Sequence, residues 1–439
     1  FQAEDGIRDC LLSRGLGDVY KRQLGEKHNR LAIEQYGSRK HKSAIEHALN
    51  KVLTLDISRQ KREALILTAN DARSCYDRIV LMAAYCTMVR FGVTKEAAQS
   101  MITTIATMEH HIRTAKGDSK RYYGGKYWVR IPHGIGQGNG AGPSIWACVS
   151  TPLFDALREE GYGMHIRSPI TLVLLNITGF SFVDDADLIQ TMGDMKTEED
   201  LFIRAQAQLI IWEQLLRTTG GAIEPSKSDW IFVRYKWNDD EWEYNRNKFQ
   251  VNLMVRNKDK EEQELRQLTI SEARETLGVW IAADGNWQTQ KQKLESKAKD
   301  WASLLKRGHL NPTDTVIATK ATIMKTLEYP LPATTLTENQ CMDIMKKILP
   351  TVLPRMKVTR TINRDAVHLP TEYRGLGIKD LYTTQGIEHI KILMRHGGED
   401  TVTGNLLQTT MELHMLEAGS THPIFSLTDK HHSLSLIHI

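Results

Sequence analysis

Two adjacent aspartates, Asp184 and Asp185, are the residues of this sequence with the clearest capacity for chemistry. Mostly apolar residues flank the pair at 179–183 and 186–189. Aspartate disfavours strands and favours turns, so the pattern predicts a tight β-hairpin with both carboxylates at its tip. Two carboxylates about 4 Å apart repel each other by roughly 4 kcal/mol at an intermediate effective dielectric. A divalent cation would offset that repulsion, and a solvated Asp-Asp turn without a ligand is the alternative interpretation.

A third carboxylate, Asp71, lies far upstream in a comparable position. It follows the short apolar run 64–69, which has the length of a strand, and it precedes a helical pattern. An antiparallel sheet pairs strands regardless of their separation in sequence, so Asp71 can lie beside Asp184 and Asp185. Three carboxylates at one sheet edge would suit two Mg²⁺ ions about 3.5–4 Å apart, which support phosphoryl or nucleotidyl transfer. A capping role for Asp71 at the next helix is the alternative.

The segments around these aspartates alternate between helical and strand patterns. Apolar residues recur at helical spacing in 43–55, 76–90, 94–114, 143–160 and 197–217, and again from 286 onward. Apolar or β-branched runs indicate strands at 121–131, 170–190, 230–233, 249–255, 265–270 and 275–281, and the charged run 257–264 indicates a solvated turn. The sequence therefore predicts a mixed α and β protein that becomes helical after residue 286.

The composition is that of a globular protein with a mild excess of positive charge. The chain has 439 residues, of which 41% are hydrophobic and 25% charged, and its net charge is +4. Residues 286–360 contain thirteen Lys and Arg against six Asp and Glu, which permits contact with phosphates, although a solvated helix face is the alternative. Five cysteines without a CxxC pair indicate neither a zinc site nor a disulfide framework. This cysteine usage suits an intracellular compartment, cytoplasm or nucleus, and no apolar run reaches membrane-spanning length.

The two ends of the chain differ in character from the rest. Residues 1–23 and 433–439 resemble translated adapter sequence, and the chain begins without methionine. We therefore expect both ends to be artefacts and exclude them from the fold argument.

Taken in order, the remaining features resemble the motifs of reverse transcriptases, most closely those of non-LTR retroelements and group II-intron-like elements. Asp71 with Tyr76 five residues later resembles motif A, Gln137-Gly138 with Pro143 resembles motif B, and 182–185 resembles the F/Y-x-D-D of motif C. Lys227 resembles the motif D lysine, 277–279 resembles motif E, 35–39 resembles the fingers segment before motif A, and 369–377 resembles the stretch after the thumb. Motif B departs from the usual PQG, because Gly136 replaces the proline and residues 139–142 precede Pro143.

The resemblance implies a role for each matching residue. Asp71, Asp184 and Asp185 would hold two Mg²⁺ ions, with Mn²⁺ as a substitute, and Lys227 would give a proton to the leaving pyrophosphate. Ala72, Tyr76, Gln137 and Gly138 would contact the incoming nucleotide, and the Tyr76 ring would exclude a 2′-hydroxyl. Leu277, Gly278, Arg39 and Lys40 would contact primer or template. The residues alone leave a structural alternative open for three of these roles. Tyr76 could be part of the hydrophobic core, Lys227 could be a solvated surface lysine, and Gln137 could stabilise its loop.

The resemblance also implies an architecture and an activity. The fold would be an α+β polymerase right hand, whose antiparallel palm sheet has helices packed on one face. Partial fingers would occupy 24–62, the palm with embedded fingers helices 63–284, a helical thumb 285–360 and a C-terminal helical region 361–432. The activity would be DNA synthesis from dNTPs on an RNA template with a DNA primer, as part of a retroelement, and incomplete fingers would limit it. A degenerate maturase-like RNA-binding module, or another palm-fold enzyme such as an RNA polymerase, is the alternative.

Overall fold

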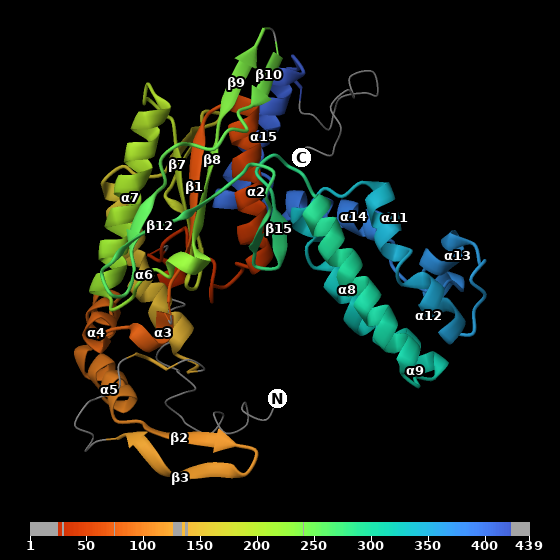
Figure 1. The fold of residues 1–439 in the computed structure, drawn as a ribbon, viewed down its shortest axis with the longest axis horizontal. Coiled ribbons are helices and arrows are strands. Elements are labelled where there is room, and N and C mark those ends of the chain that lie inside the picture. The colour runs from red at the N-terminus through yellow and green to blue at the C-terminus, as the bar shows by residue number, and fades with distance from the viewer. Residues whose placement is uncertain are drawn as a thin grey trace.

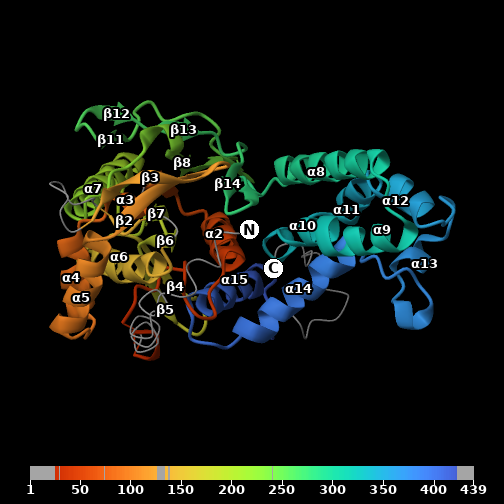
Figure 2. The same cartoon turned by 90° about the horizontal axis from the view of Figure 1, so that it is seen from below.

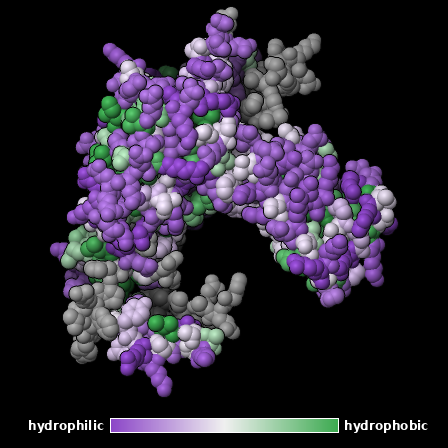
Figure 3. Space-filling model, viewed as in Figure 1, coloured by the Kyte–Doolittle hydropathy of each residue, from purple (hydrophilic) through white to green (hydrophobic). Residues whose placement is uncertain are grey.

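The computed structural model describes residues 25–28, 30–73, 75–125, 134–136, 139–239 and 241–422. A body built around a β-sheet and an arm built from helices make up the molecule (Figure 1). Figure 3 shows a wide concave opening between the body and the arm. The two end segments that we expect to be artefacts, 1–23 and 433–439, lie outside the described residues. Within the described residues, no helix has the length and apolar character needed to cross a membrane.

A five-stranded mixed sheet forms the centre of the body. Its order is β13 (Arg266–Leu268), β8 (Asp229–Val233), β1 (Leu65–Asp71), β7 (Asp185–Thr191) and β6 (Gly179–Phe182). All neighbouring strands are antiparallel except β13 and β8, which are parallel. The prediction of a purely antiparallel sheet was therefore wrong at one edge. Strand β1 is central, and all its residues before Asp71 are buried, because helices cover both faces of the sheet.

Side chains alternate between two hydrophobic clusters on opposite faces of the sheet. Leu65, Leu67 and Ala69 pack in the same cluster as helix α2 (Ala44–Lys61), whereas Ile66 packs in the cluster of α6 (Gly142–Glu159) and α7 (Glu198–Thr218). Helices therefore lie on both faces, and the expectation of a one-faced sheet was wrong. Strand periodicity explains this arrangement, since successive residues of a strand point to opposite faces and both faces of β1 contribute buried residues.

The arm consists of helices that continue the first hydrophobic cluster. It contains α8 (Gln288–Arg307), α9 (Pro312–Ala318), α10 (Met324–Glu328), α11 (Glu338–Met345), α12 (Leu349–Arg355), α13 (Arg364–His368) and α14 (Leu381–His396). Helix α15 (Val402–Glu417) then returns to the body and lies beside α2 (Figure 2). Gln60 Nε2 and His414 Nε2 are 2.6 Å apart at this contact, and Thr403 donates a hydrogen bond to Glu46 at 3.1 Å.

Several short elements differ from the sequence prediction. The expected helix 94–114 ends early, because α5 spans Lys95–Ala106 and is followed by a hairpin of β2 (Glu109–Thr114) and β3 (Gly117–Gly124). The expected helix 76–90 is two helices, α3 (Cys75–Arg78) and α4 (Leu81–Arg90), and the expected strand 275–281 is a hairpin of β14 (Arg274–Thr276) and β15 (Val279–Ile281). Three further hairpins are β4 (Met164–Arg167) with β5 (Leu174–Ile177), β9 (Tyr235–Asn238) with β10 (Glu241–Tyr244), and β11 (Met254–Arg256) with β12 (Glu262–Glu264). The last of these replaces part of the expected turn 257–264.

A buried ion pair joins α2 to the sheet. Lys51 Nζ lies 2.9 Å from Asp187 Oδ1, and His47 Nε2 lies 2.9 Å from Asp187 Oδ2. Burial by itself would raise the pKa of Asp187, but the Lys51 charge and the His47 hydrogen bond outweigh it and lower that pKa well below its usual range. The carboxylate is therefore ionised in the folded protein, and its stabilising effect is lost only as the pH falls through this lowered pKa.

Replacing Lys51 with methionine should destabilise the protein by about 3–5 kcal/mol, because it leaves the Asp187 charge buried without its ammonium partner. Chemical denaturation at pH 7 measures this change in the free energy of unfolding. The double variant Lys51→Met/Asp187→Asn removes both charges and should recover most of the loss. Equal destabilisation in the single and double variants would contradict the electrostatic explanation and indicate lost packing instead.

Candidate active site

The three predicted aspartates meet at one end of the sheet. Asp71, the last residue of β1, pairs directly with Asp185, the first residue of β7. Asp184 lies in the two-residue turn between Phe182 of β6 and Asp185. The predicted hairpin with an acidic tip is therefore confirmed, and the long-range approach of Asp71 to this tip is confirmed as well.

The backbone around Asp71 is fixed by a second segment. The Asp71 amide donates to Ser228 Oγ at 3.1 Å, and the Glu224 amide donates to the Asp71 carbonyl at 2.9 Å. Ala72 forms an isolated antiparallel bridge with Ile223, and its side chain is buried. Segment 222–228 thus holds the end of β1 in place, while the predicted nucleotide contact of Ala72 stays a prediction.

The turn that contains Asp184 has a strained backbone. Val183, its first residue, has φ of 60°, a conformation that β-branched side chains rarely adopt. Such a residue costs on the order of 1–3 kcal/mol and persists only where its surroundings hold it. Gly37 lies against this turn so closely that a Cβ added there would be 2.5 Å from the Val183 nitrogen. The turn is therefore packed against segment 31–37 and is not a solvated loop.

In the acidic cluster, burial and like charges outweigh the nearby positive charges. Burial and the neighbouring Asp184, Asp187 and Asp71 charges raise the pKa of Asp185 to about 6. Burial raises the pKa of Asp184 and of Asp71 as well, and Lys227 opposes the shift in both. Each raised pKa means that ionising the carboxylate is unfavourable in this environment. A cation bound among the carboxylates would offset this unfavourable free energy of ionisation.

The donor chemistry of the cluster fits a hard divalent cation. The three carboxylates offer only oxygen ligands, which Mg²⁺ prefers and which distinguish the cluster from a thiolate or imidazole zinc site. Among the described residues, no three His, Cys, Asp or Glu side chains form a preformed metal-binding group. The three aspartates are included in that result, so the binding of Mg²⁺ by Asp71, Asp184 and Asp185 stays a prediction.

Two cations lie at the edge of this cluster. Lys227 Nζ is 3.9 Å from Asp71 Oδ2, and 67% of its side chain is exposed. Arg274 lies 2.5 Å from Asp229 Oδ1 and donates to the Lys227 carbonyl at 3.3 Å. Arg274 thus has a close carboxylate partner, whereas the largely exposed Lys227 ammonium has only a long contact with Asp71.

Tyr76 lies beneath the start of α6. Its carbonyl accepts a hydrogen bond from the Ile135 amide at 2.8 Å, and a Cβ added at Gly142 would be 3.3 Å from its ring. The ring is half-buried, so both core packing and contact with a sugar are compatible with its position. Gln137 and Gly138 lie outside the described residues, and their predicted roles are unchanged.

The residues predicted to contact primer or template lie apart from one another. Leu277 and Gly278 form the turn between β14 and β15, both with positive φ, and Tyr329 donates a hydrogen bond to the Leu277 carbonyl at 2.8 Å. Arg39 pairs with Glu26 at 2.8 Å, and only 7% of its side chain is exposed, so this placement leaves little of it for a phosphate. Lys40 is exposed and stays a predicted contact.

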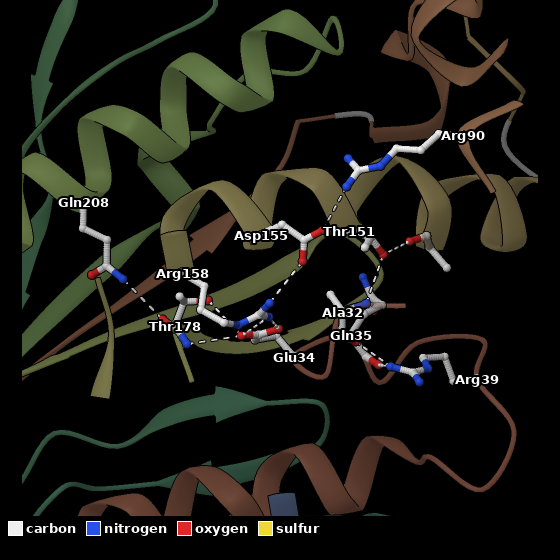
Figure 4. Close-up of polar contacts among 11 residues, drawn as sticks. Ala32, Glu34, Gln35, Arg39, Arg90, Thr151, Asp155, Arg158, Thr178 and Gln208 are labelled. Carbon is white, nitrogen blue, oxygen red and sulfur yellow. Dashed lines mark hydrogen bonds and ion pairs between the residues drawn. The ribbon is translucent and has the colours of Figure 1, made fainter. Parts of the chain in front are cut away.

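Several buried residues support the turn that holds the carboxylates, and this role was not predicted from the sequence. Trp146 of α6 donates its ring N–H to the Val183 carbonyl, and Gln35 hydrogen-bonds the same turn. Glu34 accepts hydrogen bonds from Arg158 at 2.6 and 2.9 Å and from Thr178 (Figure 4). These contacts join residues more than thirty positions apart, and no local pattern in the sequence indicates them.

Comparisons with known proteins add no family assignment. No protein-family model matches the sequence, and no curated protein is significantly similar to it. Among solved structures, telomerase from Candida albicans with a TWJ fragment of telomeric RNA matches 94% of this chain at 11% identity and a TM-score of 0.39, over 56% of its own length. Telomerase from Candida tropicalis with a TWJ fragment of telomeric RNA matches 94% of this chain at 11% identity and a TM-score of 0.38, over 55% of its own length. The apo form of Candida tropicalis telomerase matches 89% of this chain at 12% identity and a TM-score of 0.35, over 59% of its own length. The chain thus spans a little over half the length of these structures, and TM-scores this low leave the fold to be argued from its own residues.

Proposed function

We propose that this chain is a metal-dependent nucleotidyltransferase that synthesises DNA on an RNA template, as retroelement reverse transcriptases do. The observation that best supports the proposal is the pairing of Asp71 with Asp185 beside the Asp184 turn. Together with Tyr76 five residues after Asp71, this arrangement matches the order and spacing of the motifs found in the sequence. A pure RNA-binding module has no need of three partly buried carboxylates whose ionisation is unfavourable.

Each residue of the site has a separate task in this proposal. Asp71, Asp184 and Asp185 would hold two Mg²⁺ ions, which when bound activate the primer hydroxyl and neutralise charge on the phosphates. The Lys227 ammonium would donate a proton to the leaving pyrophosphate, a role suited to an exposed side chain beside Asp71. Tyr76 would shape the sugar pocket, and the fixed end of β1 would align the reacting groups.

Primer extension on poly(rA) with an oligo(dT) primer and dTTP tests the proposal directly. The full chain should incorporate dTMP in the presence of Mg²⁺ and should stop when EDTA is added. Asp184→Asn is the matched control, because it keeps the size of the side chain and removes its charge. Tight binding of the template–primer without incorporation, unaltered by Asp184→Asn, would favour the RNA-binding alternative over catalysis.

A further inference from the structure

We propose that Gln35 is a positioning residue that fixes the Val183–Asp184 turn and thereby sets the direction of the Asp184 and Asp185 carboxylates. The inference rests on the proposed function for its catalytic consequence. Its structural consequence, an ordered turn, can be measured whether or not the protein is a polymerase.

Both polar ends of the Gln35 side chain contact the turn. The carbonyl Oε1 accepts hydrogen bonds from the amides of Val183 and Gly37, each at 2.9 Å. The amide Nε2 donates to the Val183 carbonyl at 3.3 Å and to the hydroxyls of Ser181 at 3.2 Å and Ser150 at 3.3 Å. Backbone amides can only donate, so the orientation of the carboxamide is determined by its partners. One side chain therefore binds both the N–H and the C=O of the strained residue.

The position of Gln35 is itself fixed. Its side chain is fully buried, and its backbone forms an isolated parallel bridge with Ser181 of β6. The Tyr36 amide donates to the Ser181 carbonyl, and the Ser181 amide donates to the Glu34 carbonyl, both at 2.7 Å. Segment 34–36 thus extends the edge of the sheet beside β6. The Glu34 carboxylate, bound by Arg158 of α6, ties this segment to a second element (Figure 4).

The turn needs such support because its conformation is intrinsically unfavourable. Val183 has a left-handed backbone, and the two residues after it are the candidate metal ligands. Without the Gln35 hydrogen bonds, the part-buried Val183 amide would lose its side-chain partner, and rotation of this peptide would redirect Asp184. Trp146 donates to the same carbonyl and would hold the turn only from one side.

A second buried glutamine provides a matched comparison on the same hairpin. Gln208 of α7 is 2% exposed, and its Nε2 donates to the carbonyls of Thr178 at 3.3 Å and Ile189 at 3.2 Å. These contacts are at the end of the β6–β7 hairpin opposite the carboxylates. Gln208→Met therefore removes two buried hydrogen bonds on the same hairpin without touching the turn, whereas Gln35→Met removes five.

The experiment compares Gln35→Met with Gln208→Met in the full chain. Hydrogen–deuterium exchange of a peptide covering 179–188 should be faster at Val183–Asp185 in Gln35→Met and unchanged there in Gln208→Met. Mn²⁺ affinity, measured by electron paramagnetic resonance, should fall about 10–100-fold in Gln35→Met only, as expected for a residue that orients metal ligands. Trp146→Phe should give a smaller change in the same direction.

Each outcome has a distinct meaning. Unchanged exchange at the turn in Gln35→Met, or equal loss of Mn²⁺ binding in both glutamine variants, would overturn the positioning role. Faster exchange at the turn in a protein whose wild type neither binds Mn²⁺ nor extends a primer would uphold the positioning role and reject the proposed function. A Gln35→Met variant that fails to fold while Trp146→Phe folds with an unaltered turn would also overturn the proposal.

Discussion

Replacing Asp185 with asparagine should abolish primer extension and, in the absence of metal, make the protein more stable. The loss of activity should be at least about 10³-fold, because the variant removes a charge that the metal and the transition state require. The gain in stability follows from burial and from the neighbouring like charges, which together raise the pKa of Asp185 to about 6 in the folded protein.

The sign of this stability change follows from proton linkage. An unfolded aspartate ionises near pH 3.9, so between about pH 4 and pH 6 the folded state binds more protons than the unfolded state. The metal-free protein should therefore lose stability as the pH rises through this interval. Asp185→Asn removes this contribution and should add about 1–2 kcal/mol at pH 7, after allowance for the partial exposure of the carboxylate.

Thermal unfolding with and without Mg²⁺ measures both parts of the prediction. Mg²⁺ should raise the melting temperature of the wild type more than that of Asp185→Asn. Asp229→Asn is the control for stability alone, because the Asp229 carboxylate already has Arg274 as a partner 2.5 Å away. A melting temperature that falls in Asp185→Asn would show that this carboxylate stabilises the fold and would contradict the account of the acidic cluster.

Replacing Tyr76 with valine should increase ribonucleotide incorporation relative to deoxyribonucleotide incorporation by about 10²-fold. The ring lies against Gly142 at the start of α6 and is half-buried, so valine leaves space where the ring was. If that space is next to the sugar, a 2′-hydroxyl fits into it. Competition between UTP and dTTP on the same template–primer measures the ratio.

Tyr76→Phe separates the ring from its hydroxyl. It keeps the ring and should keep the discrimination between sugars, whereas a loss of discrimination in this variant would assign the effect to the phenol group. An unchanged ratio in Tyr76→Val, with extension intact, would make Tyr76 a residue of the hydrophobic core and reject its role as a gate.

The carboxylates were predictable from the sequence because their signals are local. Asp71 ends an apolar run of strand length, and Asp184 with Asp185 interrupts another. Antiparallel pairing then needed only the correct register, and the structure has Asp71 opposite Asp185. The element types around them were also predictable, since α2, α6 and α7 have apolar residues at helical spacing and β8 is a short continuous apolar run.

The other features of the fold and the site depend on tertiary contacts, which leave no local pattern in the sequence. In the hairpin of β2 and β3, the His110 ring stacks on Tyr123 with ring centroids 4.9 Å apart, and the His111 ring lies tilted against Tyr122. The helical periodicity of this segment hid the pairing of the two strands. To predict that helices cover both faces of the sheet, one would need to know that α15 and α2 lie on the opposite face from α6 and α7. In the sequence, Gln35 is a polar residue of a loop, and its contact with Val183 exists only in the folded protein.

The contact between α2 and α15 has a consequence for biosynthesis. Residues 44–61 leave the ribosome long before residues 402–417, yet the two helices pack side by side and share hydrogen bonds. The face of α2 that packs against α15 therefore lacks this partner until residues 402–417 have been translated. Contacts this distant in sequence slow folding and prolong the exposure of apolar surface, so chaperone dependence should be concentrated in the nascent chain before α15 emerges.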